Sequence, residues 1–298
     1  MTPDAFPDAL PDVESLVDGL DSTGPSQAEF ETDSVLPLEF FHLHTAPFLD
    51  SVNPHFFFRT EAHEETFVKM KQCVEEDIAL GLTTAVSGTG KTLLTQLLLN
   101  DLDPRKYRML LLLVYPNMSR TAILEEIVRE LGLEITQKRP TLRHLMAYIQ
   151  QEIIRLYEEK TKLVLIIDEA HFLRADSLHL LRTLSNIEIP EKKLVTVLLF
   201  AEECFLTRLS DPIYKALFSR MFMRCDLRPL TLQEIEQYVK FRVLVAGGKP
   251  GLFDDNVFPV LAELSKGIPR EINRICHNAL LTAAARRRRI ITGDLLRG

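Results

Sequence analysis

The chain has 298 residues, and its 46% hydrophobic and 26% charged content excludes a wholly disordered or fibrous protein, because such a mixture can bury a sizeable core. The net charge is −7, but residues 1–58 hold eleven acids and no Lys or Arg, which leaves +4 for the remainder (−7 minus −11). The widely spaced cysteines and short apolar runs argue against a disulfide framework, a zinc site, a signal peptide and a membrane span. We therefore expect a cytoplasmic protein.

Residues 1–36 are acidic and contain four prolines, a composition typical of a flexible tail. The spacing of Phe6, Leu10, Val13 and Leu16 would also allow a short amphipathic helix on a partner. Two interpretations therefore stay open: a solvated tail without a partner, and an autoinhibitory or docking segment that competes for basic surface.

From Phe40 onward, predicted helices and strands alternate. Val-, Ile- and Leu-rich strands separated by helices predict a parallel sheet that is covered on both faces. We predict strands over residues 82–86, 109–115, 163–167, 194–200 and 222–227, and helices over 61–78, 121–131, 142–157 and 177–187, with a further helix ending at 99.

After Pro229 the pattern becomes helical. The predicted helices cover residues 231–245, 255–265 and 269–286, and Thr231 with Glu234 has the spacing of a capping box. We therefore divide the chain into a tail (1–36), an α/β core (37–229) and a helical subdomain (230–298).

The strongest motif is Ser-Gly-Thr-Gly-Lys-Thr at residues 87–92, between a predicted strand and a predicted helix. Its glycines let backbone N–H groups close around phosphate oxygens, and the following helix N-terminus favours an anion. Lys91 would reach the β- and γ-phosphates of ATP, and the Thr92 hydroxyl would bind Mg²⁺. The strict motif has glycine where this chain has Ala85, which we expect to be tolerated because the tightest turns fall at Gly88 and Gly90. The expected nucleotide-binding residues in this loop are Ser87, Gly88, Thr89, Gly90, Lys91, Thr92 and Leu93.

A second motif ends the strand at 163–167 with Asp168 and Glu169. Ligands of open α/β sheets bind at the carboxyl ends of the strands, where both acids would lie. Asp168 would bind the nucleotide's Mg²⁺, and Glu169 would orient and polarise the attacking water. The second motif follows Lys91 by 77 residues (168 minus 91), with a strand and a helix between them. Together the motifs predict an ATPase that uses ATP and Mg²⁺.

The run Asp168-Glu169-Ala170-His171 resembles that of the AAA+ ATPases. With residues 57–64, 227–230 and 267–274, the chain more closely resembles the ExeA/GspA-like secretion ATPases, to which the TniB/TnsC-type transposition ATPases are related. The resemblance covers residues 40–298. It implies a P-loop NTPase of the α/β class, with an AAA+ αβα core around a five-stranded parallel sheet and a C-terminal helical lid.

The resemblance also implies roles outside the two motifs. Arg270 is similar to the second sensor, which contacts the γ-phosphate and couples lid position to nucleotide state. Arg220 is similar to the arginine finger that one subunit offers to its neighbour, which implies a homo-oligomer, with a hexamer favoured. A surface ion pair or a helix cap is the alternative for both arginines. Glu202 occupies the place of a polar first sensor, although a carboxylate near a γ-phosphate is electrostatically unfavourable.

Of three further features, the first and the last allow two interpretations each. His171 would either switch with nucleotide state or simply pack or face water. Arg59 and His63 lie where relatives contact the adenine end of the nucleotide. The basic run at residues 286–289 would either complement the dipole of the last helix or contact phosphates or an acidic partner.

Two functions from different classes follow from the resemblance, each with an unidentified partner. The first is an ATPase that energises a secretion or envelope-assembly machine. Since full-length secretion members continue into a membrane span and a wall-binding region, we expect a truncated or stand-alone member, or a machine that supplies the membrane attachment. The second is a DNA-associated ATPase that regulates a transposase or another DNA-processing partner, for which Arg120 and Lys138–Arg139 are candidate contacts. A signalling ATPase that uses ATP as a switch is a third possibility.

Overall fold

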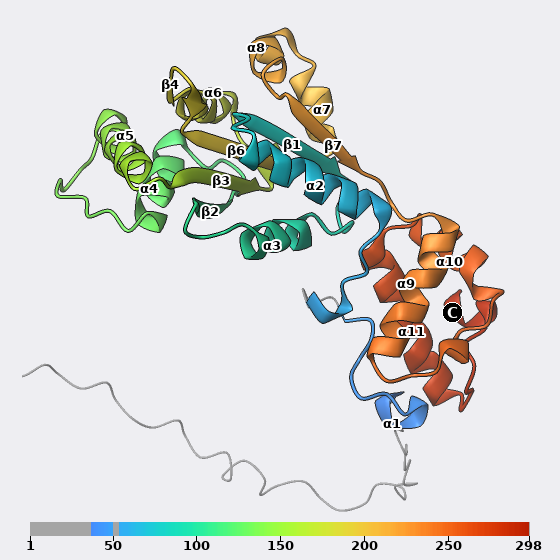
Figure 1. Cartoon of the computed structure of the whole chain (residues 1–298). Helices are drawn as coiled ribbons and strands as arrows, with labels where there is room; N and C mark the ends of the chain where they lie inside the picture. The colour runs from blue at the N-terminus through green and yellow to red at the C-terminus, as the bar shows by residue number, and fades with distance from the viewer. Residues whose placement is uncertain (1–36, 50–53, 298) are drawn as a thin grey trace, which may run out of the picture. The chain divides into compact units, whose positions relative to one another are not determined.

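The computed structural model describes residues 37–49 and 54–297. Figure 1 shows an α/β core built on one central sheet, followed in the sequence by a group of helices. The acidic tail predicted over residues 1–36 lies outside the described residues.

All five predicted strands join one parallel sheet with the order β2-β3-β6-β1-β7 (Figure 1). Leu113 of β2 pairs with Asp168 of β3, and Ala85 of β1 pairs with Glu202 of β6. The carboxyl ends of these four strands therefore meet at one edge of the sheet, which is where ligands bind in this class of fold. The strands are β1 Leu80–Ala85, β2 Tyr107–Leu113, β3 Lys162–Asp168, β6 Val195–Glu202 and β7 Met223–Leu227.

Alternate residues of the central strands face two different helical layers. On β3, Leu163 and Leu165 belong to a hydrophobic cluster with α4, α5 and α6, whereas Val164 and Ile166 belong to a cluster with α2 and α3. Successive side chains of a strand point to opposite faces, so a strand that is covered twice must be apolar at nearly every position. These helices are α2 Glu61–Glu75, α3 Lys91–Asp101, α4 Arg120–Glu130, α5 Leu142–Glu158 and α6 Ala175–Ser185. The predicted αβα arrangement is confirmed.

Several short elements were not predicted. An antiparallel hairpin of β4 (Glu188–Ile189) and β5 (Lys192–Lys193) follows α6, and α7 (Cys204–Leu209) and α8 (Lys215–Phe218) lie between β6 and β7. Elements of two to six residues do not repeat an apolar spacing often enough to be detected from the sequence. Short 3-10 helices cover Pro54–Phe56, Ala170–Phe172, Pro212–Tyr214, Pro250–Leu252 and Gly293–Leu296.

The C-terminal helices form as predicted: α9 Leu232–Val245, α10 Val257–Ser265 and α11 Pro269–Ala285. The predicted capping box is present at the start of α9. Thr231 Oγ1 accepts a hydrogen bond from the Glu234 N–H, and the Glu234 carboxylate accepts one from the Thr231 N–H at 2.8 Å. Two backbone donors of the first turn are thereby satisfied.

The aromatic segment before the core packs with these C-terminal helices. It contains α1 (Pro37–Phe41), and its buried side chains at Phe41, Leu43, Phe48 and Phe56 share a hydrophobic cluster with α9, α10 and α11. The segment thus precedes the α/β core in the sequence while its apolar side chains join the helical group. The domain boundary at residue 229 stays a prediction. Over the ranges 37–49 and 54–297, no helix has both the length and the apolar character needed to cross a membrane.

Candidate functional site

The loop between β1 and α3 turns tightly at two glycines. Gly88 has φ +84° and Gly90 has φ +107°, and these positive values are ones that residues with a side chain rarely adopt. Helix α3 begins at Lys91, directly after Gly90, so the loop runs into a helix N-terminus whose backbone N–H groups favour an anion. Ala85, the departure from the strict motif, is the last residue of β1. A strand conformation suits alanine, so this position does not require glycine.

The side chain of Lys91 lies against the backbone of this loop. Its Nζ donates to the carbonyl oxygens of Ala85 at 3.2 Å and Val86 at 3.4 Å. Burial lowers the pKa of the ammonium, and the nearby carboxylates of Glu169 and Glu202 act in the opposite direction. A partly desolvated ammonium whose hydrogen-bond partners are neutral carbonyls is well suited to a phosphate anion.

The two motifs meet directly. Thr92 Oγ1 donates to Asp168 Oδ2 at 2.9 Å, and the other carboxylate oxygen of Asp168 accepts from the Glu169 N–H at 2.9 Å. Asp168 is buried at the end of β3, and Thr92 lies in the first turn of α3. A hydroxyl and a carboxylate at this separation are the oxygen donors that Mg²⁺ binds together with phosphate oxygens. The residues therefore fit a nucleotide-bound Mg²⁺ ion.

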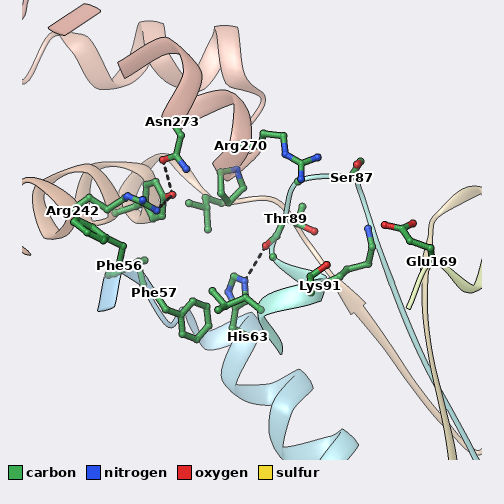
Figure 2. Close-up of a pocket in the computed structure, with 18 residues that line it drawn as sticks. Phe56, Phe57, His63, Ser87, Thr89, Lys91, Glu169, Arg242, Arg270 and Asn273 are labelled. Atoms are coloured by element: carbon green, nitrogen blue, oxygen red, sulfur yellow. Dashed lines mark hydrogen bonds between the residues drawn. The ribbon is translucent and has the colours of Figure 1, made fainter. Parts of the chain in front are cut away.

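Glu169 has a left-handed backbone conformation with φ +56°. This conformation is uncommon for a residue with a side chain, and such strain is often found at functional sites. The side chain lines the same pocket as Lys91, and Figure 2 shows its carboxylate near the Lys91 ammonium. A carboxylate in this place could orient a water molecule for attack on a phosphate.

His171 lies between the two glutamates at the end of the site. Its Nδ1 is 3.3 Å from Glu169 Oε2 and also accepts from the Glu202 N–H at 3.4 Å. The first contact requires a proton on Nδ1 and the second requires a lone pair, so one nitrogen cannot make both at once. The structure thus places Glu202, at the first-sensor position, beside Glu169 and His171, with their ligand-type atoms within 4.8 Å of one another.

Arg270 lies at the start of α11 and reaches the same pocket from the C-terminal helices. Its backbone N–H donates to the Gly88 carbonyl at 3.3 Å, and a Cβ on Gly88 would lie 2.8 Å from the Arg270 Cβ. Only a residue without a side chain permits this close approach between the loop and α11. Figure 2 shows the guanidinium extending toward the loop near Ser87.

Arg220 is separate from this pocket in the described part of the chain. It is exposed after α8, and its guanidinium donates to the side chain of Asn186 at the end of α6. One chain therefore brings together Lys91, Thr92, Asp168, Glu169 and Arg270, but not Arg220.

The opposite end of the pocket is aromatic and was not found by sequence reasoning. It is lined by Phe56, Phe57, Phe58, Leu230, Tyr238, Arg242 and Asn273, and Ser87, Thr89 and Leu93 line the loop end (Figure 2). The aromatic run at residues 56–58 is visible in the sequence as a possible signal. Tyr238, Arg242 and Asn273 belong to helices whose sequences show only an ordinary amphipathic pattern, so no local signal identifies them.

His63 supports the phosphate-binding loop from α2. Its Nε2 donates to the Thr89 carbonyl at 3.0 Å, and its Nδ1 accepts from the Thr60 hydroxyl at 2.7 Å. Burial lowers the pKa of His63, which favours the neutral ring that this pattern requires. By contrast, Arg59 pairs with Glu64 at 2.6 Å and is not among the residues that line the pocket in the described ranges.

Comparison with known proteins agrees with this geometry. Residues 76–209 match the model of a family described as an AAA domain. The chain is 33% identical over 258 residues to general secretion pathway protein A of Aeromonas hydrophila, an alignment that covers 86% of this chain and 47% of that protein. The chain thus spans about half the length of the curated relative that it matches.

Solved structures support the same fold at lower identity. The chain is similar to the Aeropyrum pernix ORC2 protein in its ADPNP–ADP complexes, with a TM-score of 0.60 and 17% identity over 83% of this chain and 68% of that one. It is also similar to the Aeropyrum pernix ORC1 protein in complex with DNA, with a TM-score of 0.61 and 18% identity over 83% of this chain and 66% of that one. At such identities the likeness establishes the fold alone.

Proposed function

Because this chain belongs to the AAA+ P-loop proteins as a GspA-like member, we propose that it binds ATP together with Mg²⁺ and hydrolyses the terminal phosphate. The observation that carries this proposal is the 2.9 Å contact between Thr92 Oγ1 and Asp168 Oδ2, beside Lys91 and Glu169. It joins the phosphate-binding loop to the acidic strand end in the arrangement that phosphoryl transfer requires.

Each residue then has a definite task. Lys91 and the backbone N–H groups of the loop bind the β- and γ-phosphates, which orients the substrate. Thr92 and Asp168 would hold Mg²⁺, which would supply neutralising charge for the phosphate oxygens. Glu169 orients a water molecule and withdraws its proton as the water attacks the γ-phosphorus, while the bond from that phosphorus to the β–γ bridging oxygen breaks and ADP leaves. Arg270 lines the same pocket from the C-terminal helices and would contact the γ-phosphate.

The direct experiment measures phosphate release from ATP over a Mg²⁺ series, with EDTA as the metal-free arm. We expect hydrolysis that requires Mg²⁺ and is lost in the Asp168→Ala variant. Folded wild-type protein that neither binds ATP nor releases phosphate at any Mg²⁺ concentration would refute the proposal.

We further propose that the active form is a ring in which Arg220 completes the site of the neighbouring subunit. Arg220 is exposed on the segment between β6 and β7 and does not line the pocket of its own chain within the described residues. An arginine supplied in trans stabilises charge on the transferred phosphoryl group. A hexamer is the favoured ring, as the family resemblance implies.

For the biological role, we propose that nucleotide turnover drives assembly or remodelling of a secretion or envelope machine. The 33% identity to general secretion pathway protein A supports this role. Because this chain covers only 47% of that protein, any partner of this chain is a proposal as well. ATP would come from the cytoplasm, where the sequence predicts the protein to lie.

A DNA-associated role is the alternative, favoured by one surface feature. The four arginines at residues 286–289 are exposed after α11, although Arg288 pairs with Asp294 and Arg289 lies over the Phe40 ring. Filter binding of duplex DNA over a salt series, with and without ATP, distinguishes the two roles. Tight binding with a steep salt dependence favours DNA, and weak binding that ATP does not change favours the secretion role.

A further inference from the structure

Helix α11 contributes two polar side chains to the pocket, three residues apart. Arg270 and Asn273 both line it, and residues at this spacing share one face of a helix. In Figure 2, Arg270 extends toward the loop at Ser87, whereas Asn273 points toward the end that holds Arg242 and Phe56. One helix face thus reaches both ends of the pocket.

Asn273 is held by two consecutive hydrogen bonds, and the donor-only character of a guanidinium fixes which atom donates in each. Arg242 Nη1 donates to the Tyr238 hydroxyl at 2.8 Å, and that hydroxyl donates to Asn273 Oδ1 at 2.8 Å. A guanidinium has donors only, so the phenol oxygen must accept from Arg242 and its single proton is directed to Asn273. The carbonyl oxygen of the Asn273 amide is therefore engaged, and its NH₂ group is turned away from Tyr238.

The three side chains are rigidly placed. Each is buried, and Arg242 Nε also donates to the Pro47 carbonyl at 2.6 Å while its guanidinium lies over the Phe56 ring. Burial raises the pKa of the Tyr238 phenol, so the hydroxyl keeps its proton and remains a donor. A rotated amide would turn its NH₂ group toward the phenol and deprive the phenol proton of its acceptor, which is costly for a buried group.

We propose that Asn273 donates a hydrogen bond from Nδ2 to a ring nitrogen of the purine base, so that α11 reads the base through Asn273. This inference rests on the proposed nucleotide-binding function. Purine rings offer unprotonated nitrogens as acceptors, and the aromatic and aliphatic side chains around Asn273 suit the flat apolar faces of the base. The hydrogen bonds from Arg242 through Tyr238 occupy the Asn273 carbonyl oxygen and leave its NH₂ group for the base. Asn273 should therefore prefer an acceptor atom on the base.

The test compares binding free energies in a double-mutant cycle, in which one change removes the Asn273 amide and the other removes a single ring nitrogen of the base. Equilibrium binding of ATP, 1-deaza-ATP, 3-deaza-ATP and 7-deaza-ATP is measured by calorimetry with the full chain and with Asn273→Leu. In wild type, one of the three analogues should bind roughly 3–10-fold more weakly than ATP, the range expected for one hydrogen bond. In Asn273→Leu that penalty should disappear, because the partner of the missing atom is gone.

Two further variants guard against a change in folding. Asn273→Asp keeps the acceptor for Tyr238 and replaces only the NH₂ group, so it should abolish the same penalty. Asn278→Leu, on an exposed part of α11, is the matched control and should retain the full penalty. If wild type binds ATP but all three analogue penalties persist unchanged in both Asn273 variants, the inference is wrong while the proposed function stands. Failure of wild type to bind ATP at all would overturn both.

Discussion

The hydroxyl of Thr92 and the carboxylate of Asp168 lie 2.9 Å apart although 76 residues separate them in the sequence. Their contact joins the first turn of α3 to the end of β3. The strand order makes this possible, because β6 lies between β3 and β1 and all three strands run in the same direction. We propose that a metal-bound triphosphate would bind beside this pair.

Replacement of Lys91 by alanine should abolish nucleotide binding without loss of the fold. The ammonium is the cation of the phosphate-binding loop, and no other residue of the described pocket occupies its place against Ala85 and Val86. Burial lowers the pKa of Lys91, so a charged lysine here opposes folding at neutral pH and its removal should leave the melting temperature unchanged or raised. Titration with a fluorescent ATP analogue measures the loss, and exposed Lys249→Ala is the control. Unaltered affinity in Lys91→Ala would show that the loop does not bind phosphate.

Glu169→Gln should keep ATP bound and slow its hydrolysis by roughly 10²–10⁴-fold, the usual contribution of a general base. The amide preserves the shape of the side chain but cannot take a proton from water. Single-turnover hydrolysis and nucleotide affinity should be measured on the same preparation. If Glu169→Gln hydrolyses ATP at the wild-type rate, another group is the general base, and neighbouring Glu202 is the first candidate.

Arg220→Ala should bind ATP normally and hydrolyse it poorly, since an arginine finger contributes about 10³–10⁵ in rate in well-studied cases. Because each site would need its neighbour, the variant should also inhibit wild type in mixed preparations. Specific activity is measured against protein concentration, together with light scattering in the presence of a non-hydrolysable analogue. Arg139→Ala, at another exposed arginine, is the control. Activity per subunit that stays constant down to concentrations where only monomer is present would contradict completion in trans.

The stability of the C-terminal helices should fall in acid. Hydrogen bonds from Arg228, at 2.6 and 3.0 Å, lower the pKa of Glu234 to about 2. A carboxylate with a depressed pKa stabilises the fold above its unfolded value, near 4.5, and this contribution is lost as the pH falls toward 2. With Arg228 partly exposed, we expect about 1–2 kcal/mol at neutral pH.

Thermal unfolding of wild type and Glu234→Gln between pH 7 and pH 2.5 measures this contribution. The variant should be less stable at pH 7, and the two proteins should converge as the pH falls. Parallel curves over the whole range would show that the carboxylate charge does not contribute.

Much of the fold and half of the site could be predicted from the sequence. The loop at residues 87–92 is a local Gly-rich pattern between a strand and a helix that is typical of phosphate binding, and Asp168–Glu169 follows an apolar strand. The AAA+ αβα fold implied by the resemblance is confirmed by the sheet order and by the family match. The short helices α7 and α8 were missed because they are too short to show a period.

The sequence by itself determined the phosphate-binding loop motif and the acidic strand end, because each is encoded within a few consecutive residues, and it predicted that they bind phosphate and magnesium. Only the tertiary structure decided that Thr92 touches Asp168, that His63 supports the Thr89 carbonyl, and that Asn273 accepts a hydrogen bond from Tyr238. These contacts join elements that lie far apart in the chain. Which elements meet depends on the strand order and on the packing of α9 and α11 against Phe41, Leu43, Phe48 and Phe56, and no local spacing of residues predicts either. In the sequence, Arg242 cannot be distinguished from an exposed arginine. Its burial against Tyr238 and Phe56 is what allows it to fix the direction of the Tyr238 hydroxyl, and through it the Asn273 amide.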